Sequence, residues 1–318
     1  MNWAGHKGVR PFHFPMPSLA INRGIVAALW IPTDANGQVL DIALARQIDF
    51  IKANGCHAIL ALGSTGEFVH FSELERARLL GRIVELAAPL PVMANVSDVS
   101  PLVARHLAKV AEQAGCASIA VLPPWYFAVG QDDLLAFFLH VADATSLPTL
   151  LYNFPERTGN RIALETIAAF TDRARMAGVK QSGAEFGYHR ELIALGRQRG
   201  FPIFTGADLR LPETLDLGCS GTISGLANLT PDLLSGLFSA WEAGRADEVS
   251  ALDHQIVRAG QIIGQLPFPL DVSAGVLARG LEPGAFKSVI SVPTHQRYVR
   301  VAHEMKEQFQ DWGLAPAR

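Results

Sequence analysis

Residues 176–183 read Met-Ala-Gly-Val-Lys-Gln-Ser-Gly, an apolar run with a lysine near its carboxyl end and turn residues directly behind it. The run predicts a buried strand that ends at Ser182 and Gly183. Of the six lysines in the chain, only Lys180 lies in a predicted strand. An ammonium group there needs a partner or a lowered pKa, and a lysine with a lowered pKa can form a Schiff base. The alternative is a strand-end lysine whose ammonium reaches water.

On both sides of this run the chain alternates between predicted strands and helices. Asp41 is predicted to cap the first helix, and Ser72 opens the second with a capping box to Glu75. Eight strand–helix units in about 220 residues favour an α/β fold, a closed (β/α)8 TIM barrel, over an open doubly wound sheet. The predicted strands cover residues 25–31, 56–62, 91–96, 118–122, 149–153, 176–181, 203–205 and 222–224.

The same pattern divides the chain into three parts. Residues 1–22 form an irregular leader rich in proline and aromatic residues, and residues 23–244 form the barrel, which a helix at 230–244 completes. Residues 245–318 carry no strand pattern and predict a C-terminal helical extension, with helices at 246–264, 270–281 and 294–312.

Composition excludes several classes of protein. The 318 residues are 49% hydrophobic and 18% charged, with a formal net charge of −3, which is typical of a soluble globular protein. No basic patch predicts nucleic acid as a partner, no apolar run is long enough for a membrane span, and the N-terminus lacks the apolar core of a signal peptide. The three cysteines make no disulfide framework, so we expect reduced thiols and a cytoplasmic protein.

Those cysteines belong to a weak internal repeat. Asn54-Gly55-Cys56, Ala114-Gly115-Cys116 and Leu217-Gly218-Cys219 each join a helix end to a strand start. The glycine predicts a left-handed helix cap, and the cysteine predicts a small buried apolar side chain. No CxxC or HxxxH spacing supports a metal site, and no GxGxxG follows the first strand to bind a dinucleotide.

In a barrel of this class the chemistry lies at the carboxyl ends of the strands. Residues 63–67, Gly-Ser-Thr-Gly-Glu, follow the second strand and can offer backbone N–H groups to a small anion. Tyr152 stands at the end of the fifth strand, where a phenol near a lysine can relay protons. Glu67 is predicted to have a structural role at a helix N-terminus.

These strand ends carry four motifs in a fixed order: GSTGE at 63–67, YNFPERTG at 152–159, VKQSG at 179–183 and GTIS at 221–224. With them the chain resembles the dihydrodipicolinate synthase / N-acetylneuraminate lyase family of pyruvate-dependent class I aldolases, over residues 24–300. The resemblance implies that Lys180 forms the Schiff base and that Tyr152 relays protons above it. It implies that Ser64, Thr65 and the Ile223 backbone bind the pyruvate carboxylate.

The resemblance also implies an assembly. Thr65 would connect Tyr152 to Tyr126, and Tyr126 would reach across a dimer interface into the neighbouring site. A homotetramer, built as a dimer of dimers, is therefore expected. The lysine Schiff base makes a metal or organic cofactor unnecessary.

The second substrate is open. Arg157 matches the arginine that faces the carboxylate of aspartate semialdehyde in the synthases, which favours condensation of pyruvate with that aldehyde; the alternative is that Arg157 pairs with Glu156 or another acid. Asp208 fits a sugar-hydroxyl contact, although Leu209 stands where the sialic acid lyases have a glutamate. A 2-keto-3-deoxy sugar acid aldolase or dehydratase is the alternative enzyme, and a catalytically silent 2-oxo acid binding protein is the alternative of another class.

Overall fold

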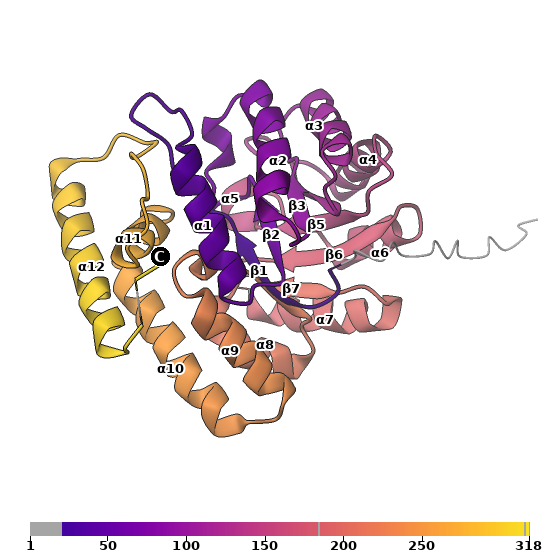
Figure 1. Ribbon diagram of the computed structural model, residues 1–318. Coiled ribbons are helices and arrows are strands. Elements are labelled where there is room, and N and C mark those ends of the chain that lie inside the picture. Colours follow the sequence, from indigo (N-terminus) through magenta and orange to yellow (C-terminus); the bar gives the residue numbers. More distant parts are fainter. Residues whose placement is uncertain (1–20, 184, 315, 318) are drawn as a thin grey trace, which may run out of the picture.

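The computed structural model describes residues 21–183, 185–314 and 316–317, and most of the predicted leader lies outside them. Eight parallel strands close into one barrel in sequence order, so the predicted (β/α)8 fold is confirmed (Figure 1). The strands are β1 (Gly24–Ala28), β2 (Ala58–Ala61), β3 (Val92–Asn95), β4 (Ser118–Val121), β5 (Thr149–Asn153), β6 (Met176–Gln181), β7 (Ile203–Thr205) and β8 (Gly221–Ser224).

Helices surround the barrel and connect its strands. They are α1 (Asp41–Ala53), α2 (Glu73–Ala87), α3 (Pro101–Gln113), α4 (Gln131–Ala142), the short α5 (Pro155–Thr158), α6 (Leu164–Thr171), α7 (Phe186–Arg199), α8 (Leu211–Leu217) and α9 (Pro231–Glu242). Since nearly every strand residue is buried on both sides, the strands read as continuous apolar runs instead of alternating ones. That property made the strands visible in the sequence.

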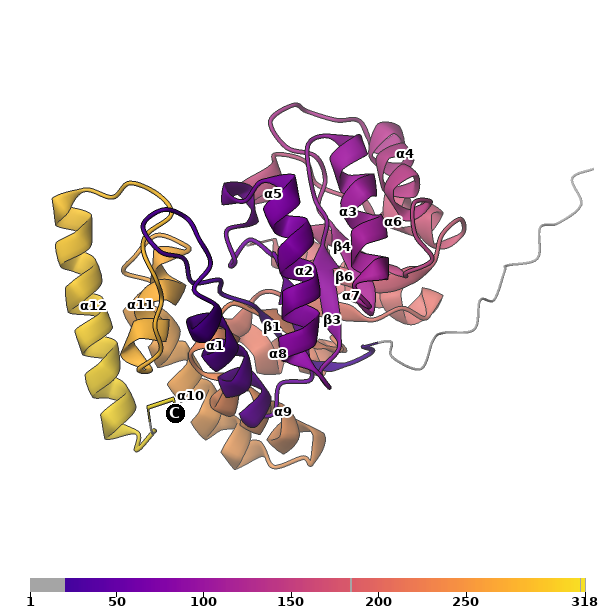
Figure 2. The same cartoon turned by 45° about the horizontal axis from the view of Figure 1, so that its top comes forward.

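The C-terminal part of the chain is helical, as predicted. It consists of α10 (Ala246–Ile263), α11 (Leu270–Ala278) and α12 (Val292–Asp311). Figures 1 and 2 show α11 and α12 gathered on one side of the barrel, beyond α1. The division between barrel and extension at residues 244 and 245 stays a prediction.

Local chemistry explains several boundaries. Ser72 and Glu75 form the predicted capping box, in which the Ser72 N–H donates to Glu75 Oε2 at 2.8 Å. The predicted cap at Asp41 is wrong: Leu40 is the cap residue and Asp41 is the first residue of α1, with no side-chain cap bond. A carboxylate in the first turn still interacts favourably with the helix dipole.

The barrel closes where β8 meets β1. A β-carbon built on Gly221 would lie 1.9 Å from the Gly24 carbonyl oxygen, so no larger residue fits there. The three glycine–cysteine junctions behave as predicted: Gly55, Gly115 and Gly218 have positive φ, and the cysteine after each is buried.

Candidate active site

Lys180 and Tyr152 lie side by side on neighbouring strands. The parallel register of β5 and β6 pairs Tyr152 with Lys180, and residues paired in this way direct their side chains to the same face of the sheet. Lys180 Nζ lies 4.4 Å from the centre of the Tyr152 ring. The two side chains are 5% and 2% exposed, so the amine is held in a largely dry place against the phenol.

The Tyr152 hydroxyl reaches across the barrel mouth. Tyr152 OH lies 3.5 Å from Ser64 Oγ, and Ser64 follows β2, which stands three strands from β5 in the closed order. A contact of this kind is possible only if both side chains lie over the carboxyl end of the barrel. Lys180 therefore faces the barrel mouth and not the outer helices.

Asp208 supplies a negative charge near the lysine. Its two carboxylate oxygens accept hydrogen bonds from Thr222 Oγ1 and Ser224 Oγ, each at 2.7 Å. Burial raises the pKa of Asp208, and these hydrogen bonds and the Lys180 charge act against that rise. The carboxylate is thus fixed by β8 and lies within electrostatic reach of the amine.

The turn at 63–67 approaches the loop after β8. Thr65 is buried, and a β-carbon built on Gly225 would lie 3.3 Å from Thr65 Oγ1, so the hydroxyl lies against the backbone just beyond Ile223. The side chains and backbone predicted to bind a carboxylate therefore converge from β2 and β8. That they bind pyruvate stays a prediction.

Tyr126 does not join this group within one chain. Its side chain is 87% exposed and its backbone is left-handed, with φ of 83°. Its ring packs edge-on against Phe127, with centroids 4.8 Å apart. The expected link from Tyr152 through Thr65 to Tyr126, and the reach of Tyr126 into a neighbouring chain, stay predictions.

The structure adds a buried ion pair that the sequence did not reveal. Lys287, in the segment between α11 and α12, donates to Glu67 Oε2 at 2.9 Å and to the Ile31 carbonyl at 2.7 Å. Its ammonium also lies 4.5 Å from the centre of the Trp30 ring. Burial lowers the pKa of Lys287, and the Glu67 carboxylate opposes that shift. Glu67 precedes the 3-10 helix at Phe68–His70, as its predicted place at a helix N-terminus requires, but its side chain makes no cap hydrogen bond there. Its carboxylate instead anchors the segment between α11 and α12 to the turn at 63–67.

A cavity of about 270 Å³ lies beside the turn, and residues from the loops before and after α11 contribute to its lining. Ser64 belongs both to its wall and to the group around Tyr152, so the cavity opens next to Tyr152 and Lys180. Its apolar wall consists of Phe68, Val69, Leu122, Trp125, Phe268 and Pro269, and its polar wall of Ser64, Glu67, His70, Arg157, Thr158 and Ser288.

Arg157 lies in this wall between two aromatic rings. Its guanidinium carbon is 5.7 Å from the Phe154 ring centre and 5.4 Å from that of Phe268. Burial raises the pKa of Asp271 to about 6, and the positive charge of Arg157 acts against that rise. Arg157 thus has an electrostatic neighbour in Asp271, and its binding of a substrate stays a prediction.

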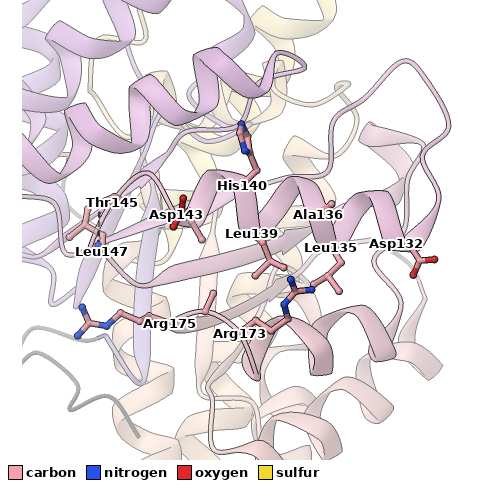
Figure 3. Close-up of a pocket in the computed structure, with 12 residues that line it drawn as sticks. Asp132, Leu135, Ala136, Leu139, His140, Asp143, Thr145, Leu147, Arg173 and Arg175 are labelled. Atoms are coloured by element: carbon pink, nitrogen blue, oxygen red, sulfur yellow. Dashed lines mark hydrogen bonds between the residues drawn. The ribbon is translucent and has the colours of Figure 1, made fainter. Parts of the chain in front are cut away.

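A larger cavity, about 740 Å³, lies elsewhere (Figure 3). Its residues come from α4 and from the loops that lead into β5 and β6, including Leu147 and Arg175. It is therefore at the amino ends of those strands, opposite the barrel mouth, and holds none of the predicted site residues.

Within the described part of the chain no group of three or more His, Cys, Asp or Glu side chains could hold a metal ion. Nor does any described helix have the length and apolar character that crossing a membrane requires.

Comparison with known proteins gives a consistent result. The sequence model of the dihydrodipicolinate synthetase family matches residues 22–308. A 4-hydroxy-tetrahydrodipicolinate synthase of Pseudomonas putida is 29% identical over 81% of this chain and 88% of its own length. An uncharacterized DapA-like lyase of Halobacterium salinarum is 28% identical over 87% of this chain and 92% of its own.

A solved structure is similar over nearly the whole chain. It is YagE, a prophage protein of Escherichia coli that belongs to the dihydrodipicolinic acid synthase family, in complex with pyruvate. The TM-score is 0.84 at 26% identity, over 93% of this chain and all of YagE.

Proposed function

The chain belongs to the dihydrodipicolinate synthetase family, whose members are lyases and aldolases, and on that premise we propose that it is a class I aldolase acting on pyruvate or a related 2-oxo acid. The observation that carries this proposal is the pairing of Lys180 with Tyr152, whose hydroxyl lies at Ser64 across the barrel mouth. No metal or organic cofactor is required, because the covalent imine activates the substrate.

Neutral Lys180 attacks the carbonyl carbon of pyruvate, and loss of water gives an iminium ion. The iminium withdraws electrons, so a proton leaves C3 and an enamine forms. Tyr152 is the proton relay in these steps because its ring covers Nζ and its hydroxyl lies at Ser64. Ser64, Thr65 and the backbone at Ile223 bind the carboxylate.

The enamine then adds to an aldehyde. Its C3 forms a bond to the aldehyde carbon, the aldehyde oxygen takes a proton from Tyr152, and water releases a 4-hydroxy-2-oxo acid from Lys180. We assign Arg157 to a carboxylate on the aldehyde, as in aspartate semialdehyde, because its guanidinium lies in the wall of the adjoining cavity. Asp208 remains a substrate-binding residue, since its carboxylate lies within electrostatic reach of Lys180 at the ends of the strands.

A homotetramer in which Tyr126 completes a neighbouring site belongs to the same proposal. Its support is the exposure of the Tyr126 ring, which a single chain leaves without a buried partner group. The partners are thus small molecules and copies of this chain, and the expected location is the cytoplasm.

Borohydride trapping tests the proposal. The protein is incubated with pyruvate, reduced and weighed, and peptide mapping then identifies the modified lysine. We expect one adduct, on Lys180, in the wild-type protein and none in Lys180→Met. Lys306→Met is the control, because Lys306 is exposed on α12 and its substitution leaves the site and its wall unchanged. Absence of an adduct on the wild-type protein supports the catalytically silent binding protein.

The second substrate is then identified by turnover. Condensation with aspartate semialdehyde supports the synthase-like reaction. Cleavage or dehydration of 2-keto-3-deoxy sugar acids supports the alternative enzyme, for which Asp208 is the observation in favour.

A further inference from the structure

The cavity next to the reacting groups has an aromatic wall. Trp125 packs edge-on against Phe68, with centroids 5.7 Å apart and planes at 84°, and Phe268, in the loop between α10 and α11, lies 5.4 Å from the Arg157 guanidinium carbon. Together with Val69, Leu122 and Pro269, these side chains make up the apolar half of the lining. They come from three separate parts of the chain, and η1 (Phe68–His70) supplies the first of them.

Most polar groups in the same wall already have partners within the protein. Glu67 pairs with Lys287, and Thr158 Oγ1 donates to the Asn160 carbonyl at 2.9 Å. The hydroxyl of Ser288 lies 3.4 Å from His70 Nε2. Beyond Ser64, Arg157 is the wall group that offers several donors to a ligand.

This distribution discriminates between aldehydes. A hydroxyl-rich aldehyde would lose its hydration on entering the cavity and would find few donors or acceptors in return. The ammonium group of an amino aldehyde would likewise lose its hydration without gaining a partner, because the Glu67 carboxylate is bound to Lys287. A flat apolar body would instead displace water from Phe68, Trp125 and Phe268, and a single carboxylate could bind Arg157.

We infer that the second substrate is an aldehyde with an apolar, aromatic body and at most one carboxylate. This inference rests on the proposed aldol function and narrows it. The bond formed is from C3 of the pyruvate enamine to the aldehyde carbon. The aldehyde oxygen takes the proton, and hydrolysis of the iminium releases a 4-aryl-4-hydroxy-2-oxobutanoate, so atoms and electrons balance without an oxidant or reductant.

A panel of aldehydes offered with pyruvate tests this assignment. The panel contains the three isomers of carboxybenzaldehyde, benzaldehyde, aspartate semialdehyde and D-glyceraldehyde, and kcat/KM is measured for each. We expect the best carboxybenzaldehyde to exceed D-glyceraldehyde and aspartate semialdehyde by about tenfold or more. Benzaldehyde should fall between these groups, because it fills the apolar wall but has no carboxylate for Arg157.

Two variants at one position connect the preference to the cavity. Phe268→Leu keeps an apolar wall and should preserve the ranking, whereas Phe268→Ser should lower the ratio of carboxybenzaldehyde to glyceraldehyde turnover by about tenfold. Borohydride trapping of pyruvate is recorded for every protein, and it reports on Lys180 independently of the aldehyde.

The outcomes distinguish the proposed aldol function from the assignment of an aromatic aldehyde. Failure of trapping in the wild-type protein refutes the aldol function itself. Normal trapping with glyceraldehyde or aspartate semialdehyde as the best substrate refutes the aromatic assignment alone. So does normal trapping with no turnover of any carboxybenzaldehyde, or a ranking that Phe268→Ser leaves unchanged.

Discussion

Lys287→Met should be among the most destabilising single substitutions outside the barrel strands. Methionine has a similar length but cannot donate to Glu67 or to the Ile31 carbonyl, which lie 2.9 and 2.7 Å from Nζ. The Lys287 and Glu67 side chains are only 4% and 9% exposed, so the remaining carboxylate has little access to water. Removing one partner of a buried ion pair costs roughly 3–5 kcal/mol, and we expect a loss in that range.

Urea denaturation at a fixed protein concentration measures the effect, because association between chains would otherwise alter the apparent stability. Lys306→Met is the matched control, since Lys306 is exposed on α12 and its substitution should change the free energy of unfolding by at most about 0.5 kcal/mol. Glu67→Gln keeps a neutral acceptor for Lys287 and should cost less, about 1–3 kcal/mol.

A double substitution tests whether the cost comes from an unpaired buried charge. Lys287→Met combined with Glu67→Leu removes both charges, and it should be more stable than Lys287→Met alone. Equal stability of Lys287→Met and Lys306→Met would refute this reasoning. The reasoning would also be contradicted if the double variant lost as much stability as Lys287→Met and Glu67→Leu lose separately in total. The two side chains would then act independently.

Three further predictions address the site and the fold. Arg157→Ala should leave pyruvate trapping nearly intact and lower turnover with an acidic aldehyde on the order of 10²-fold, whereas equal loss of both would indicate collapse of the loop. Burial raises the pKa of Asp271 from 3.8 to about 6, so the folded protein binds more protons than the unfolded chain between these values and loses stability as the pH rises through them. The free energy of unfolding of Asp271→Asn, relative to that of the wild type, should therefore rise by about 2–3 kcal/mol between about pH 4 and pH 7. A difference between the urea midpoints of the two proteins that stays constant over this pH range would contradict this. Gly221→Ala should cost more than about 4 kcal/mol because its β-carbon would meet the Gly24 carbonyl oxygen, while Gly81→Ala, with open space around it, should be neutral or stabilising in a thermal melt.

The barrel was predictable because its strands are buried on both faces and are separated by residues with strong turn preferences. Gly55, Gly115 and Gly218 end helices in the left-handed conformation, which few other residues adopt, so the sequence records these boundaries directly. Asp41 was misplaced by one position, since a carboxylate suits both the cap and the first turn of a helix.

The residues of the site that lie on the barrel strands could be predicted from the sequence. Lys180 stood out as the only lysine in a predicted strand, and its pairing with Tyr152 follows from the register of adjacent strands. Lys287 gave no such signal. It lies in an irregular segment, and its burial depends on contact with a turn 220 residues earlier in the chain.

The strand ends that carry Lys180 and Tyr152 and the wall of the adjoining cavity are consequently held in place by different contacts. The strand ends are held by barrel register, which brings Tyr152, Lys180 and the hydroxyls that bind Asp208 to the ends of β5, β6 and β8. The adjoining wall depends on long-range packing, since Phe268 lies in the loop between α10 and α11 and Ser288 lies next to Lys287, whose pair with Glu67 attaches the segment between α11 and α12 to the barrel. A substitution in that segment can change the shape and polarity of the cavity while Lys180 stays in place. Strand-end motifs therefore predict the chemistry on pyruvate, whereas the aldehyde must be inferred from the packed wall.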